Sequence, residues 1–108
     1  MRILLDECVP KPLKREFTDL DIRTVREMGW SGTKNGALLK LMSEERFTIL
    51  LTSDRNIKYE QNLQQAGIAV IVMVARTNRL PDLLPLIPKV RKALSSIAPG
   101  ELIEVDNY

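Results

Sequence analysis

The stretch TILLTSDRN, residues 48–56, contains a predicted strand followed directly by a polar loop, and it decides the fold. Residues 48–52 are short and almost entirely apolar or β-branched, which is typical of a central parallel strand covered on both faces. The N-terminus repeats this arrangement, because the strand-like run at residues 2–5 stops at Asp6 and Glu7. Acidic side chains therefore follow two predicted strands.

Strands and helices alternate along the rest of the chain. Further strands are predicted at 22–25, 68–75 and 102–105, and helical segments at 13–17, 37–42, 61–67 and 80–97. The last strand is expected at a sheet edge because acidic residues surround it, and Pro85 and Pro88 are expected to kink or break the last helix. Strands separated by helices predict a three-layer α/β/α fold with a mostly parallel sheet of about five strands. We expect a single domain over residues 1–108.

The composition excludes several classes of function. The 108 residues include no histidine, which excludes an imidazole base, histidine-ligated zinc and serine–histidine triads. Cys8 is the single cysteine, so an intrachain disulfide is excluded and a reducing, cytoplasmic location is favoured. No apolar run approaches the ~20 residues of a transmembrane helix, so no membrane association is expected. The remaining chemistry depends on carboxylates, lysine, hydroxyls or a metal held by oxygen.

The two acidic loops are the candidate site. Ligands of open parallel sheets bind beyond the carboxyl ends of the strands, which is where Asp6 and Glu7, and then Asp54 and Asn56, are predicted. If the two strands are neighbours, Asp6 and Asp54 converge and suit Mg²⁺ or Mn²⁺, which need few protein ligands and keep several waters. Such an ion supports in-line phosphoryl displacement without histidine. The alternative interpretation is that each aspartate only caps a turn or a helix.

Cations and one aromatic residue near these loops are candidates for substrate binding. Lys11 and Arg15 come after the first acidic loop, and Arg55 and Lys58 belong to the second loop or come after it. Each of these four cations is either a phosphate ligand or an ordinary solvated charge. Trp30 either stacks a nucleic acid base or covers the core.

Two later segments suggest partners. Lys89, Arg91 and Lys92 in the last helix either bind RNA or are shielded by the acidic C-terminal residues or an acidic partner. The leucine-rich segment 80–87 either covers an interface, with a second copy or a small partner protein, or packs into the core.

Three stretches resemble the small PIN-like domains found as ribonuclease toxins, of the VapC-like kind, in bacterial and archaeal toxin–antitoxin pairs. They are LLDECVPKPLKRE at 4–16, EMGWSGTKNGALLKLMSEE at 27–45 and LLTSDRNIKYEQNL at 50–63. The resemblance implies a PIN-like α/β/α fold, RNA cleavage dependent on Mg²⁺ or Mn²⁺, and inhibition by a small antitoxin protein. The acidic positions of the family fall on Asp6, with Glu7 beside it, and on Asp54, with Asn56 where many relatives have a second aspartate.

One position departs from the family pattern. Relatives usually have a glutamate at the position of Ala37, where the helix start projects an acidic residue into the site. Loss of that carboxylate weakens the predicted metal site, so a catalytically inactive module that still binds RNA or an antitoxin is an alternative.

A second alternative is a receiver-like phosphoacceptor domain with Asp54 as the acceptor. Receivers also place an acidic pair after the first strand and an aspartate after the third. They carry a lysine after the last strand, however, where this chain has Glu104 to Tyr108. The nuclease hypothesis is therefore ranked first.

Overall fold

A five-stranded parallel sheet forms the centre of the computed structural model, which describes residues 1–33, 35–55 and 63–107. The strands are β1 (Arg2–Leu5), β2 (Asp21–Thr24), β3 (Ile49–Thr52), β4 (Ala69–Met73) and β5 (Leu102–Val105). Their order is β2-β1-β3-β4-β5, and every neighbouring pair is parallel. The predicted α/β class and strand number are confirmed, and β5 lies at an edge as its charges predicted.

Helical segments connect the strands. They are the 3₁₀ helix η1 (Lys11–Phe17), α1 (Asn35–Glu44), α2 (Leu63–Ala66), α3 (Leu80–Leu83), the 3₁₀ helix η2 (Leu84–Leu86) and α4 (Ile87–Leu94). The segment predicted at 13–17 begins earlier than expected and is a 3₁₀ helix, with a proline in its first turn. The predicted helix at 80–97 is divided into α3, η2 and α4 and ends at Leu94, because Pro85 and Pro88 cannot supply backbone hydrogen bonds in a helix interior.

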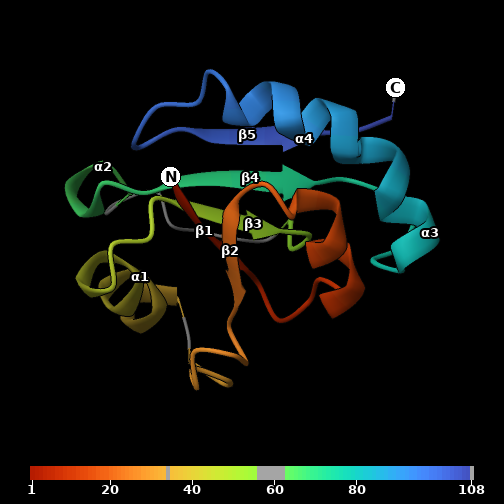
Figure 1. Cartoon of the computed structure of the whole chain (residues 1–108). Helices are drawn as coiled ribbons and strands as arrows, with labels where there is room; N and C mark the ends of the chain where they lie inside the picture. Colours follow the sequence, from red (N-terminus) through yellow and green to blue (C-terminus); the bar gives the residue numbers. More distant parts are fainter. Residues whose placement is uncertain (34, 56–62, 108) are drawn as a thin grey trace.

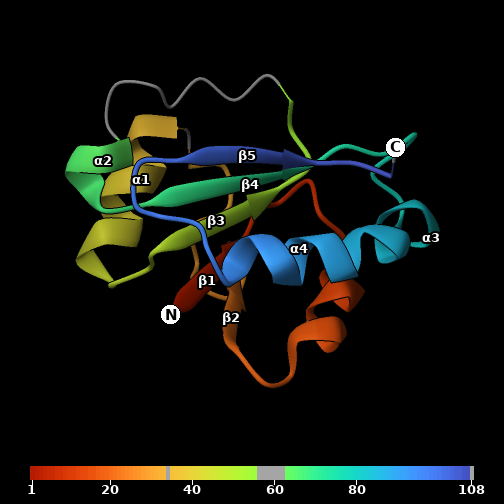
Figure 2. The same cartoon turned by 90° about the horizontal axis from the view of Figure 1, so that it is seen from above.

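The helices form a layer on each face of the sheet (Figure 1), and Figure 2 shows α1 and α2 on one side with η1 and α4 on the other. Successive strand side chains point to opposite faces, so each strand contributes to two cores. Leu4 and Leu50 pack with residues of α1 and α2. Their neighbours Leu5 and Leu51 pack with residues of η1, α3 and α4. Both faces of the sheet are therefore covered by helices, and the ends of the strands are left for the site.

The leucine-rich segment contributes mainly to the core. Leu83, Leu86 and Ile87 are buried in the cluster beneath α4 and η1, whereas Leu84 is partly exposed. The burial agrees with the core-packing interpretation of this segment. Among the described residues, no helix is long and apolar enough to cross a membrane.

Candidate functional site

The acidic loops after β1 and β3 lie side by side at the carboxyl edge of the sheet. β1 and β3 are hydrogen-bonded neighbours, and the backbone N–H of Asp6 donates to the carbonyl of Leu51 at 3.0 Å. The chain runs from β1 outward to β2 and then returns to the opposite side of β1 as β3. The gap between β1 and β3 is therefore the topological switch point, where ligands of open α/β sheets bind.

The hydroxyl of Thr52 links the two loops. Thr52 is fully buried, and its Oγ1 donates to Oδ2 of Asp6 at 2.8 Å while accepting the backbone N–H of Asp54 at 3.1 Å. The other carboxylate oxygen of Asp6, Oδ1, accepts the backbone N–H of Glu7 at 2.8 Å. The Cys8 thiol also approaches Oδ2, at 3.9 Å. These bonds hold the Asp6 carboxylate in one orientation, and Oδ1 has a second lone pair beyond the one that accepts from Glu7.

Glu7 contacts the loop that precedes α1. Its Oε1 accepts the backbone N–H of Gly32 at 2.6 Å, which ties the 29–33 loop to the first acidic loop. Trp30 in that loop packs edge-on against Phe47 with ring centroids 5.7 Å apart, and it adjoins the core beneath α1. This packing is what the core-cover interpretation of Trp30 expects, and its role in base stacking stays a prediction.

A groove of about 470 Å³ opens beside Asp6, at the carboxyl ends of β1 and β2. This Asp6 groove is lined by Leu5, Asp6, Glu7, Val9, Pro10, Lys11, Thr24, Val25, Arg26, Glu27 and Ser31. It brings three carboxylates and two cations to the same opening. The groove is large enough to accept part of an extended polar ligand next to Asp6.

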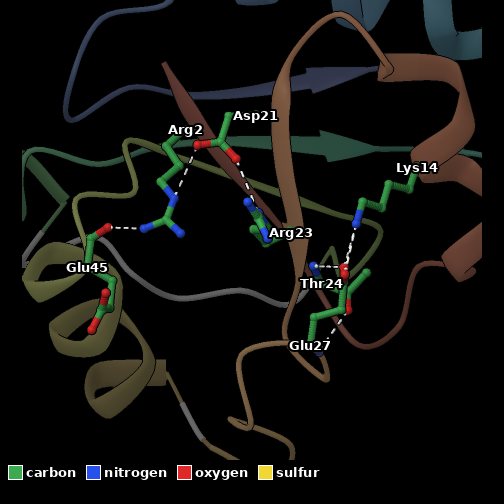
Figure 3. Close-up of polar contacts among 7 residues, drawn as sticks. All are labelled: Arg2, Lys14, Asp21, Arg23, Thr24, Glu27 and Glu45. Carbon is green, nitrogen blue, oxygen red and sulfur yellow. Dashed lines mark hydrogen bonds and ion pairs between the residues drawn. The ribbon is translucent and has the colours of Figure 1, made fainter.

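Glu27 forms one wall of the Asp6 groove and is held by two elements (Figure 3). Lys14 of η1 donates to its carboxylate at 2.8 and 2.9 Å, and the backbone N–H of Thr24 donates to Oε1 at 2.9 Å. The Thr24 hydroxyl in turn accepts the backbone N–H of Glu27 at 3.0 Å. Hydrogen bonding from Lys14, followed by that from Thr24, lowers the pKa of Glu27 to about 2.

A second cavity, of about 310 Å³, lies beside Asp54 and opens toward the end of β4. This Asp54 cavity is lined by Cys8, Ser53, Asp54, Arg55, Met73, Ala75, Thr77 and Asn78. The half-buried Cys8 thiol accepts from the Ser53 hydroxyl at 3.3 Å and lies 3.4 Å from Thr52 Oγ1. Its packing among hydroxyls agrees with a structural role for Cys8.

The two aspartates fit a weak site for a hard divalent ion. Asp6 and Asp54 supply carboxylates from neighbouring strands, and Mg²⁺ is commonly held by one or two carboxylates together with waters and substrate phosphates. In the described part of the chain, no group of three acidic or cysteine side chains is arranged to hold a metal. Ala37 lies exposed in the first turn of α1 and adds no oxygen. A hard divalent ion held by Asp6 and Asp54 would therefore need water or substrate oxygens as its remaining ligands.

The other predicted substrate-binding residues are spread around this edge. Lys11 lines the Asp6 groove, and Arg55 lines the Asp54 cavity. Arg15 is exposed on η1. Asn56 and Lys58 lie outside the described residues.

Two cations of α4, Arg91 and Lys89, are engaged elsewhere. Arg91 forms a bidentate pair with Asp19 and donates to the Glu16 carbonyl, while Lys89 donates to the Asp106 carbonyl. The pair with Asp19 raises the pKa of Arg91. Lys89 thus contacts the C-terminal segment through a backbone carbonyl, and both RNA binding and shielding of this helix stay predictions.

Sequence reasoning missed two residues of this edge, Thr52 and Glu27. Thr52 lies inside an apolar run, where a β-branched residue is expected for strand formation alone. Glu27 follows Thr24 by three residues, which is the spacing of a capping box. That spacing could have predicted the reciprocal hydrogen bonds between Thr24 and Glu27.

A comparison with family models finds a match to residues 1–75, and the family is described as a PIN-like domain. The match includes both acidic loops, β1 to β4 and α1. Neither the curated proteins nor the solved structures include a match to the chain.

Proposed function

The chain belongs to the PIN-like domain family, and from that premise we propose that it is a metal-dependent nuclease that cleaves RNA. One observation carries the proposal: Asp6 and Asp54 follow neighbouring parallel strands at the switch point of the sheet, and the Thr52 hydroxyl joins their loops. The family match makes this interpretation preferable to a receiver-like phosphoacceptor.

Each of the two acidic loops has a role in this nuclease. Asp6 and Asp54 would hold Mg²⁺ or Mn²⁺, and the hydrogen bond from Thr52 would keep the Asp6 carboxylate in place for the ion. When bound, the ion supplies charge neutralisation at the scissile phosphate and lowers the pKa of the attacking water. Glu7 orients that water with the carboxylate oxygen that does not accept from Gly32, and Asn56 assists from the second loop.

A specific observation favours a second candidate, a catalytically inactive module that binds RNA or a partner protein. Ala37 is exposed at the start of α1, where a carboxylate is expected in the family, and the described residues contain no group of three metal-binding side chains. With only two carboxylates, the affinity for metal is expected to be lower than in a three-carboxylate site.

A biological role as the toxin of a toxin–antitoxin pair is part of the proposal. It is supported by the resemblance of residues 4–16, 27–45 and 50–63 to small toxins of this kind. Copurification of a small antitoxin encoded next to the gene supports this role. Purification of the chain alone, from cells expressing both genes, contradicts it.

The nuclease proposal is tested by incubating the protein with single-stranded and structured RNA in Mn²⁺, with EDTA as the metal-free control. We expect cleavage in Mn²⁺ that Asp6→Asn and Asp54→Asn each reduce by at least about 100-fold. Ala37→Glu is expected to increase the rate because it returns a carboxylate to the site.

Three outcomes are informative. Cleavage that survives both aspartate substitutions contradicts the assignment of the site. No cleavage by the natural chain, with activity gained in Ala37→Glu, identifies the inactive module. No cleavage and no metal binding by either protein contradicts the nuclease ancestry of the site.

A further inference from the structure

A basic groove lies between η1 and the edge strand β2, next to the Asp6 groove. This η1 groove has a volume of about 560 Å³ and is lined by Lys11, Pro12, Lys14, Arg15, Phe17, Thr18, Leu20 and Ile22. Three of its lining residues are cationic and none is acidic. The remaining surface is mostly apolar, so the occupant must combine negative charge with groups that tolerate apolar contact.

Two of the cations, Lys11 and Lys14, are three residues apart in η1, which is a 3₁₀ helix. Residues three apart are eclipsed in a 3₁₀ helix, with a rise of about 2 Å per residue. Lys11 and Lys14 therefore project from the same side of η1 about 6 Å apart along its axis, and Arg15 follows Lys14 directly. This separation is close to that of successive phosphates in an extended nucleic acid strand.

The η1 groove is continuous with the candidate site. Lys11 lines both grooves. Lys14 of the η1 groove is paired with Glu27 of the Asp6 groove (Figure 3), at 2.8 Å. A strand lying along η1 would therefore pass Lys11 and come close to the Asp6 groove.

We propose that the η1 groove binds the stretch of single-stranded RNA that flanks the cleavage point, an inference that rests on the nuclease function proposed above. Lys11 and Arg15 bind phosphates of the strand, and the apolar residues Pro12 and Leu20 contact the bases. Lys14 is a further phosphate ligand that Glu27 holds in the free protein. Binding of the strand exchanges the Glu27 carboxylate for a phosphate at the Lys14 ammonium group.

The same charges would attract an acidic peptide. The spacing of Lys11 and Lys14 on η1, and the position of Lys11 in both grooves, favour the RNA strand. If RNA occupies the groove, substitution of its cations weakens RNA binding, whereas if an acidic peptide occupies it, RNA binding is unchanged. An RNA-binding measurement therefore distinguishes the two occupants.

The experiment measures fluorescence anisotropy of a fluorescein-labelled unstructured RNA in EDTA, where cleavage is blocked. The double variant Lys11→Ala/Arg15→Ala is expected to bind about 10-fold more weakly at low salt. Its plot of log affinity against log salt should be shallower by about 1.4, because each phosphate contact on a single strand contributes about 0.7. Both side chains are exposed, so the fold is expected to be retained.

Glu27→Gln gives the sharper result. It removes a negative charge beside the groove and weakens the hold on Lys14, so RNA binding should become tighter by about 2- to 5-fold, the range set by an exposed ion pair. If Glu27 only stabilised the fold, the variant would bind RNA no better than the natural chain. Lys40→Ala, at an exposed position of α1 on the opposite face of the sheet from η1, is the matched control and should bind as the natural chain does.

The results separate this inference from the proposed function. RNA binding that depends on Lys11 and Arg15, in a protein that does not cleave, supports the η1 groove and contradicts the nuclease. Cleavage by the natural chain, with unchanged RNA binding in Lys11→Ala/Arg15→Ala, overturns the η1 groove and leaves the nuclease intact. In that second case an acidic partner segment is the better candidate for the groove.

Discussion

At the scale of single residues, the Thr52 hydroxyl has the most specific role. It is the buried group that bonds both to the Asp6 carboxylate and to the backbone of Asp54. Hydrogen bonds of this kind orient metal ligands, and their loss typically costs 10- to 100-fold in metal affinity or activity. The position of Asp6 is thus set by its neighbouring strand as well as by its own.

Thr52→Val tests that role. The substitution keeps the β-branched shape and removes the hydroxyl, so Mn²⁺ affinity should fall by about 10- to 100-fold, with a loss of stability of about 1–3 kcal/mol from unpaired polar groups. Affinity is measured by calorimetric titration and stability by urea unfolding. Thr48→Val, at the opposite end of the same segment, is the control, and an equal loss of affinity in both variants would contradict the assignment.

The residues of the site were predictable from the sequence to different degrees. Asp6 and Asp54 were identified because polar residues directly after strands are conspicuous in a linear sequence. The strands that precede these aspartates, β1 and β3, are neighbours. The part of Asp6 and Asp54 in metal binding stays a prediction. Thr52 could not be identified, because its partner Asp6 lies 46 residues away and only the sheet pairing brings them together.

At the scale of elements, the Lys14–Glu27 pair fastens η1 to the turn after β2. The pKa of Glu27 is lowered from 4.5 to about 2. A carboxylate whose pKa is depressed in the folded state contributes stability above its unfolded pKa, and that contribution is lost as the pH falls through the folded value. Because the Glu27 side chain is about one-third exposed, solvent screening limits the contribution to about 1 kcal/mol.

We therefore expect the natural chain to lose more stability than Glu27→Gln between pH 6 and pH ~2.5. The difference in free energy of unfolding between the natural chain and Glu27→Gln should shrink by about 1 kcal/mol as the pH falls over that range. Urea unfolding at a series of pH values measures it. A difference that is independent of pH would contradict the ion pair.

The turn that leads into β5 depends on Gly100. This residue has φ of 90°, and a Cβ added there would lie 2.9 Å from the Cβ and 3.2 Å from the Cα of Gln64 in α2. Gly100→Ala should therefore lower the free energy of unfolding by about 2 kcal/mol, through backbone strain and this contact. Equal stability of the variant and the natural chain would show that the turn adapts.

Gly36 offers a matched control in α1. A Cβ there meets nothing within 4 Å, and its φ is not positive. Gly36→Ala should raise the free energy of unfolding by up to about 1 kcal/mol, because alanine is the better helix former. Both variants are compared by urea unfolding.

Most helices and strands were predictable from the sequence, and the differences between prediction and structure have local causes. The prolines at 85 and 88 predicted the break between α3, η2 and α4 because their effect is local. The 3₁₀ form of η1 was not predicted, because the four-residue spacing of Leu13 and Phe17 resembles an α-helical pattern. Both residues are nevertheless buried on the same face of the sheet.

At the scale of the whole molecule, the strand order decides what the loops can do. Alternating strands and helices predict a parallel sheet, but no local pattern states that β1 lies between β2 and β3. The placement depends on how the crossovers pack, with η1 on one face and α1 on the other. That order sets the Asp6 and Asp54 loops side by side, and it also aligns the η1 groove with them.

The central claim is that Asp6 and Asp54 form one site for a divalent ion, and calorimetric titration of Mn²⁺ tests it most directly. The account predicts saturable binding to the natural chain, tighter binding to Ala37→Glu, and loss of binding in Asp6→Asn and in Asp54→Asn alike. Binding to either aspartate variant as tight as to the natural chain would contradict it, because the two carboxylates would then not share an ion.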